Sequence, residues 1–150
     1  MDDRPYKVYK IEKGIVIDHI PNKHALDVLK VLGLLDKEHD SLITMGMNLE
    51  SRKMGRKDVV KIEDKELSQE ELNRIAIVAP TASINIIDNS TLINKHQAIL
   101  PKKIEGLVKC PNPNCITRNE DVKTIFYPVD DKIKCHYCEN SFDRDDVELV

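Results

Sequence analysis

The sequence lacks tryptophan, has few other aromatic residues and contains no long apolar run. Its 150 residues include only two Phe and four Tyr, whereas charged residues make up 33%. No apolar run approaches the roughly 18 residues that a membrane-spanning helix needs, and the first residues do not form an apolar signal segment. We therefore expect a cytoplasmic globular protein that is neither anchored in a membrane nor exported.

Motifs of the common enzyme classes are also missing. There is no Gly-rich phosphate-binding loop and no G-x-S-x-G turn, and the chain has only five glycines in all. The formal net charge of −3 does not favour non-specific binding to nucleic acid. These absences predict a binding protein without catalytic residues.

The four cysteines lie near the end of the chain in two close pairs. Cys110 and Cys115 form the first pair, and Cys135 and Cys138 form the second. Two such pairs are typical of a tetrahedral zinc site, because each pair reaches one edge of the tetrahedron from a tight turn. Two disulfides in a secreted chain are the alternative, but the missing signal segment and the paired spacing favour metal. Because four thiolates leave no open position on zinc, we predict one structural Zn²⁺ per chain.

The hydrophobic pattern before the cysteines alternates between short strands and two helices. Residues 22–35 carry apolar residues at helical spacing after Asn22 as the cap, and Ser68 with Glu71 forms a capping box for a second helix up to Ala79. Strands are expected at 6–11, 15–20, 41–49, 56–63, 82–88 and 91–99. This order predicts an α+β fold: a ferredoxin-like α/β sandwich in residues 1–100, then a small zinc-ribbon-like β domain in residues 101–150.

Polar side chains on several predicted strands could share one sheet surface. Asn85 and Ile87 lie on one face of their strand, and Lys61, Lys95 and Asp18 come from three other strands. Together they would offer cations for a polyphosphate, a carboxylate for ribose hydroxyls and apolar groups for a base. The alternative is that lysines on edge strands only keep the surface soluble and prevent edge pairing.

Several stretches resemble one family, the regulatory chain of aspartate carbamoyltransferase. The resemblance extends from about residue 8 to residue 147. It is carried, in order, by Gly14–Pro21 (GIVIDHIP), Ile43–Leu49 (ITMGMNL), Met54–Glu63 (MGRKDVVKIE), Ile84–Asn89 (INIIDN) and Cys110–Cys115 (CPNPNC).

The resemblance implies a chain with no activity of its own that regulates pyrimidine biosynthesis. Its first domain would bind CTP, ATP or UTP as allosteric effectors and would pair two regulatory chains into a homodimer. Its zinc domain would dock on the catalytic chain, where Asn112 and Asn114 match positions that face this partner. The residues of the nucleotide site would be Val8 and Ile11 near the base, Asp18 and Lys61 near the ribose and base, His19, Asn85 and Lys95 near the phosphates, and Ile87 and Leu92 as apolar walls.

A zinc-ribbon protein that binds nucleic acid is the rival interpretation. Isolated four-cysteine ribbons often bind RNA or DNA, and the last third of the chain contains many lysines and arginines. Acidic residues outnumber them there, however, and no platform of aromatic and basic residues is evident. The regulatory interpretation therefore predicts no nucleic-acid partner.

Overall fold

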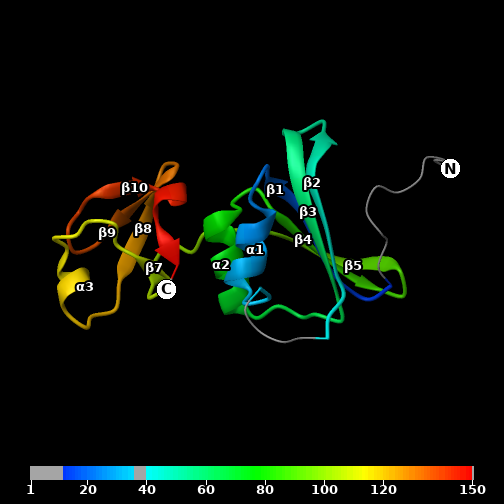
Figure 1. The fold of residues 1–150 in the computed structure, drawn as a ribbon, viewed down its shortest axis with the longest axis horizontal. Helices are drawn as coiled ribbons and strands as arrows, with labels where there is room; N and C mark the ends of the chain where they lie inside the picture. Colours follow the sequence, from blue (N-terminus) through cyan, green and yellow to red (C-terminus); the bar gives the residue numbers. More distant parts are fainter. Residues whose placement is uncertain (1–11, 36–39, 150) are drawn as a thin grey trace. The chain divides into compact units, whose positions relative to one another are not determined.

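The computed structural model describes residues 12–35 and 40–149 (Figure 1). The chain forms two compact units, Met1–Ala98 and Ile99–Val150. No helix in the described residues is long and apolar enough to cross a membrane. The elements of the first unit are β1 (Gly14–Pro21), α1 (Ala25–Val31), β2 (Ile43–Ser51), β3 (Gly55–Glu63), α2 (Gln69–Val78), β4 (Ser83–Asp88) and β5 (Thr91–Gln97).

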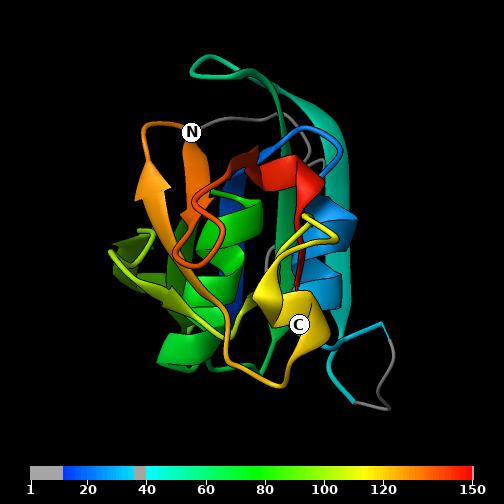
Figure 2. The ribbon, with the colours of Figure 1, turned by 90° about the vertical axis from the view of Figure 1, so that its left-hand side faces the viewer.

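These strands form one antiparallel sheet in the order β2-β3-β1-β4-β5. Both helices cover the same face of this sheet (Figures 1 and 2). The sequence of elements from β1 to β4, with β1 between β3 and β4, is the ferredoxin-like arrangement, and β5 extends it at one edge. The predicted α+β fold is therefore confirmed, while the strand expected at 6–11 lies outside the described residues.

The core of the first unit lies between the sheet and the two helices. Alternate residues of the central strands, such as Ile15, Ile17 and Ile84, are buried there. Val28 of α1 and Ile75 of α2 pack against them. Because successive strand residues point to opposite faces, the residues between these isoleucines lie on the other face of the sheet.

The start of α1 differs from the sequence prediction. The N-cap is His24, not Asn22, and no side chain of the helix itself caps it. Instead, the buried carboxylate of Asp58 on β3 accepts a hydrogen bond from the backbone N–H of Ala25 at 3.1 Å. The cap was mispredicted because its acceptor comes from a strand 33 residues further along the chain.

The end of α1 also comes earlier than predicted, at Val31. Gly33 adopts φ 72°, and its N–H donates to the carbonyl of Lys30. The N–H of Leu34 donates to the carbonyl of Leu29, which completes a Schellman ending. Leu35 is therefore beyond the helix and is 53% exposed. Both hydrogen bonds of the Ser68–Glu71 capping box predicted for α2 are present: the Ser68 side chain accepts from the Glu71 backbone, and the Glu71 side chain accepts from the Ser68 backbone.

The second unit is a small β structure around its own apolar centre. Phe126, Ile104 and Ile133 are fully buried there. One sheet has the order β10-β9-β8-β6, and β11 pairs with β7 in a second sheet. The elements are β6 (Ile104–Glu105), β7 (Val108–Lys109), α3 (Ile116–Asn119), β8 (Ile125–Val129), β9 (Lys132–Cys135), β10 (Ser141–Asp143), the 3₁₀ turn η1 (Arg144–Asp146) and β11 (Glu148–Leu149).

Candidate functional site

The strand register places a row of side chains across the face of the sheet that lies opposite the helices. Val16 on β1 lies opposite Lys61 on β3 and opposite Asn85 on β4. Asn85 in turn lies opposite Lys95 on β5. Directly paired residues in an antiparallel sheet point to the same face, so these four side chains form one row.

Neighbouring rows on this face contain the other described residues of the predicted nucleotide site. Asp18 lies opposite Ser83, two residues from Val16 along β1. On the other side, Ile87 lies opposite both Gly14 and Leu92. We call this surface the effector face, after the sequence prediction that it binds an effector; it comprises Asp18, His19, Lys61, Asn85, Ile87, Leu92 and Lys95. Val8 and Ile11 lie outside the described residues.

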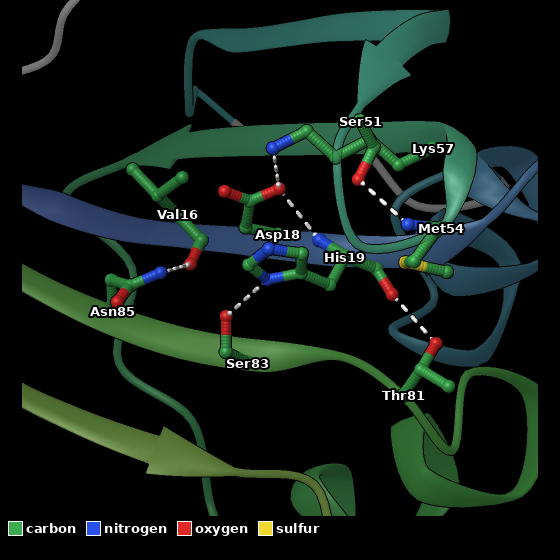
Figure 3. Close-up of polar contacts among 9 residues, drawn as sticks. All are labelled: Val16, Asp18, His19, Ser51, Met54, Lys57, Thr81, Ser83 and Asn85. Atoms are coloured by element: carbon green, nitrogen blue, oxygen red, sulfur yellow. Dashed lines mark hydrogen bonds and ion pairs between the residues drawn. The ribbon is translucent and has the colours of Figure 1, made fainter.

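The Asp18 carboxylate is held in its charged form by two donors (Figure 3). Its Oδ1 atom lies 2.9 Å from Lys57 Nζ and accepts a hydrogen bond from the backbone N–H of His19 at 2.6 Å. Burial by itself would raise the pKa of Asp18, but these hydrogen bonds and the Lys57 charge lower the pKa below its ordinary value. Asp18 therefore presents a fixed negative charge beside the lysines of the effector face.

His19 lies in a β-bulge that turns its side chain toward β4. Its φ of 58° interrupts the regular pairing between Ile17 and Ile20. The His19 Nδ1 atom lies 3.2 Å from Ser83 Oγ, and the Thr81 hydroxyl donates to the His19 carbonyl at 2.7 Å (Figure 3). The first contact holds the imidazole within the effector face, and the second holds the backbone of the bulge.

The lysines of the effector face differ in their surroundings. Burial lowers the pKa of Lys61, and the nearby Asp18 charge partly counteracts this effect. Lys95 lies on β5, whose side chains are all exposed. The face therefore combines a half-buried cation near its centre with an accessible cation at its edge.

Sequence reasoning did not assign a role to Asp58, Ser83 or Thr81. Ser83 and Thr81 act through His19, as described above. Asp58 points to the same, core-facing side of β3 as Val60 and Ile62, which are both fully buried. A carboxylate at a core position of a predicted strand could therefore have indicated a structural role for Asp58, because a buried charge needs hydrogen-bond donors.

The second unit brings the four cysteines together. Their sulfur atoms all lie within 4.8 Å of one another. The sulfurs of Cys110 and Cys138 are 3.7 Å apart, and those of Cys115 and Cys135 are 3.8 Å apart. A tetrahedral zinc with Zn–S bonds of about 2.3 Å requires sulfur–sulfur separations of about 3.8 Å. The cluster therefore fits a tetrahedral metal ion.

Hydrogen-bond donors lie close to two of the four sulfur atoms, whereas burial raises the pKa of Cys110 and of Cys135. The Thr117 hydroxyl donates to Cys115 Sγ at 3.1 Å, and the Asn140 amide donates to Cys138 Sγ at 3.6 Å. Burial acts to raise the pKa of Cys138, but hydrogen bonds, chiefly from the Asn140 backbone, bring that pKa down to about 7. His136 lies outside the cluster, exposed between the rings of Tyr127 and Tyr137.

Comparison with known proteins decides between the two interpretations of the sequence. Residues 6–98 match the family model for the allosteric domain of the aspartate carbamoyltransferase regulatory chain, and residues 102–148 match the model for its metal binding domain. The chain belongs to this family. It is therefore a non-catalytic regulatory chain, and the resemblance that the sequence motifs indicated is confirmed.

Relatives of this regulatory chain come from archaea and bacteria. The aspartate carbamoyltransferase regulatory chain of Pyrococcus horikoshii is 46% identical over 144 residues, which cover 94% of this chain and 95% of the relative. That of Chromobacterium violaceum is 44% identical over 147 residues, covering 95% of each chain. That of Phocaeicola vulgatus is 40% identical over 147 residues, covering 96% of this chain and 94% of the relative.

Proposed function

We infer that the effector face binds a nucleoside triphosphate and that this regulatory chain transmits the binding to the catalytic chains of aspartate carbamoyltransferase. One observation carries the inference: the sheet register aligns Lys61, Asn85 and Lys95 in one row beside Asp18. A face with cations, a carboxylate, an amide and aliphatic side chains can bind the phosphates, ribose and base of one molecule.

The roles of the individual residues follow from their chemistry and their places on the face. His19, Asn85 and Lys95 bind the phosphates, since they offer an imidazole, an amide and an exposed ammonium. Asp18 and Lys61 lie near the ribose and base, where the fixed carboxylate can accept from ribose hydroxyls. The effectors are CTP, ATP or UTP, with Ile87 and Leu92 as apolar walls and with Val8 and Ile11 beside the base.

The second unit has a separate role. One zinc ion bound by Cys110, Cys115, Cys135 and Cys138 is structural, because four thiolates complete its coordination. The loop between the first two cysteines is fixed by an Asx turn, in which Asn112 Oδ1 accepts from the N–H of Asn114 at 3.0 Å. Residues 101–150 dock on the catalytic chain through this loop, and residues 1–100 pair with a second regulatory chain.

Regulation requires that the effector bind one state of the assembly more tightly than another. Couplings of this kind are typically about 1–3 kcal/mol. Effector binding on the first unit and partner binding on the second would be coupled through the chain that joins them. A nucleotide bound equally well in all states would regulate nothing, however tightly it bound.

Calorimetric titration of the zinc-loaded chain with CTP and ATP tests the nucleotide site. We expect saturable binding that is strongly weakened in Lys95→Ala and unchanged in the control Lys30→Ala, whose lysine is exposed on α1 and so lies on the helix side of the sheet. Equal weakening by both substitutions, or no binding at all, would contradict the proposal. A short RNA titrated at two salt concentrations serves as a second control, because tight salt-dependent RNA binding without a nucleotide response would favour the nucleic-acid interpretation.

Reconstitution with a catalytic trimer tests the division of roles between the two units. Lys95→Ala should assemble normally and lose the nucleotide effect on catalysis. Failure of this variant to assemble would show that the effector face also takes part in partner binding.

A further inference from the structure

The metal-binding unit contains a cavity with an excess of positive charge. Its volume is about 530 Å³, which is within the range of small-molecule sites. Its walls are formed by β7, the end of α3, the loop that follows α3, and β11. Three basic residues line it, Lys109, Arg118 and Lys123, against a single carboxylate, Glu148. None of these residues belongs to the effector face or to the cysteine cluster.

Backbone contacts hold the basic residues around the cavity. Lys109 on β7 lies opposite Glu148 on β11. Arg118 Nη1 donates to the carbonyl of Cys110 at 3.2 Å, which leaves its other N–H groups for a ligand. The side chain of Lys123 lies over Gly106, so closely that a Cβ atom on this glycine would be 3.0 Å from Lys123 Cε.

The three cations of the cavity make no short ion pairs with other described residues. Within the described ranges 12–35 and 40–149, no ion pair involves Lys109, Arg118 or Lys123. Three cations and one carboxylate line the cavity, and Glu105 lies near Lys123, since hydrogen bonding and the charge of Lys103, and to a lesser degree the charge of Lys123, lower the pKa of Glu105. Like charges around one cavity repel one another, and a bound anion would relieve this repulsion.

We propose that this cavity binds a small phosphate-bearing ligand, either inorganic phosphate or a phosphate monoester. Arg118 and the two lysines bind the phosphate oxygens, since guanidinium and ammonium groups form charge-assisted hydrogen bonds with phosphate. Val122 gives the cavity an apolar wall for the organic part of a monoester. Cys110 also borders the cavity. Its metal-bound thiolate would add negative charge, so the cavity suits one dianion better than an extended polyanion.

Amide NMR of the zinc-loaded full chain tests the proposal. Inorganic phosphate and glycerol 3-phosphate are titrated separately at constant ionic strength maintained with chloride. We expect saturable shifts at Gly106, Lys109, Arg118 and Lys123 with either probe. Tighter binding of glycerol 3-phosphate would assign the site to a monoester, and equal binding would assign it to phosphate itself. Shifts confined to the effector face, or shifts that do not saturate, would refute the site.

Charge-removing variants provide the second part of the test. Lys109→Gln combined with Lys123→Gln keeps most of each side chain and should weaken phosphate binding about tenfold or more. Lys132→Gln is the matched control, because Lys132 is an exposed lysine of the same unit that does not line the cavity. Equal weakening in the control would overturn the proposal. A wild-type chain that binds no phosphate would also overturn the proposal. Loss of zinc by the double variant would then show that the cations only balance the charge of the metal centre.

Discussion

Replacement of Asp58 is expected to destabilise the first unit more than any surface substitution. Its carboxylate is fully buried and accepts two backbone hydrogen bonds, from Ala25 N–H at 3.1 Å and from Asn48 N–H at 2.9 Å. The first bond fixes the start of α1, and the second fixes the bulge of β2, where Asn48 has φ 60°. One side chain therefore connects a helix and two strands.

The expected magnitude follows from the two hydrogen bonds. Bonds to a charged group contribute about 1.5–3 kcal/mol each, so Asp58→Ala should lower the free energy of unfolding by about 3–6 kcal/mol. Total stabilities of single domains are about 5–15 kcal/mol, so a loss of this size approaches the stability of the whole unit. Asp58→Asn retains one acceptor and should lose about half as much.

Urea unfolding followed by amide signals of β1 and β4 measures the effect on the first unit alone. Glu66→Ala is the matched control, since Glu66 is exposed in the loop before α2. A loss of less than about 1 kcal/mol in Asp58→Ala would show that water or other donors replace the carboxylate, and the reasoning would then be wrong.

Three further predictions concern charge, turn geometry and metal. Lys57→Met should raise the pKa of Asp18, because burial would then act on the carboxylate without its main partner; a carboxyl NMR titration with an unchanged midpoint would contradict this. Since the folded-state pKa of Asp18 is below its ordinary value of 3.8, this contribution to stability is complete above that pH and is lost as the pH falls through the folded-state pKa. Ser90→Gly should raise the free energy of unfolding by about 0.5–1 kcal/mol, because Ser90 has φ 59° in the two-residue turn between β4 and β5; a decrease, or an equal gain in Ser90→Ala, would refute this. Chelation of the metal should expose the amides of residues 104–149 to hydrogen exchange and leave β1 and β4 protected, since the buried cluster described for the first unit is made of residues between Ile15 and Ile84. Equal loss of protection in both units would contradict independent cores.

Local sequence signals predicted the elements whose stabilising partners are close in the chain. The Ser68–Glu71 capping box spans three residues and was confirmed. The two cysteine pairs were recognised because the members of each pair are separated by only a few residues. On β4, the sequence alternation placed Ile84 and Ile86 on the core face and Asn85 and Ile87 on the other face, and the structure has the same arrangement.

Interactions between distant segments were not predictable in the same way. Asn22 looked like the cap of α1, but the acceptor is Asp58, which the β3 register brings beneath the helix. The bulge at His19 contains no glycine or asparagine that would indicate it in the sequence, and it is maintained by Ser83 on β4 and by Thr81 in the turn before β4. The cavity cations come from one strand, one helix and one loop of the second unit.

The sequence by itself determined the family, the α+β order of elements and the four-cysteine motif, because each of these depends on residue identity and spacing along the chain. Only the tertiary structure decided which polar side chains share a face. The antiparallel register aligns Lys61, Asn85 and Lys95 in one row, and a shift of one residue in any pair would have turned part of that row toward the core. Register depends on packing across the whole sheet, and no single strand contains that information.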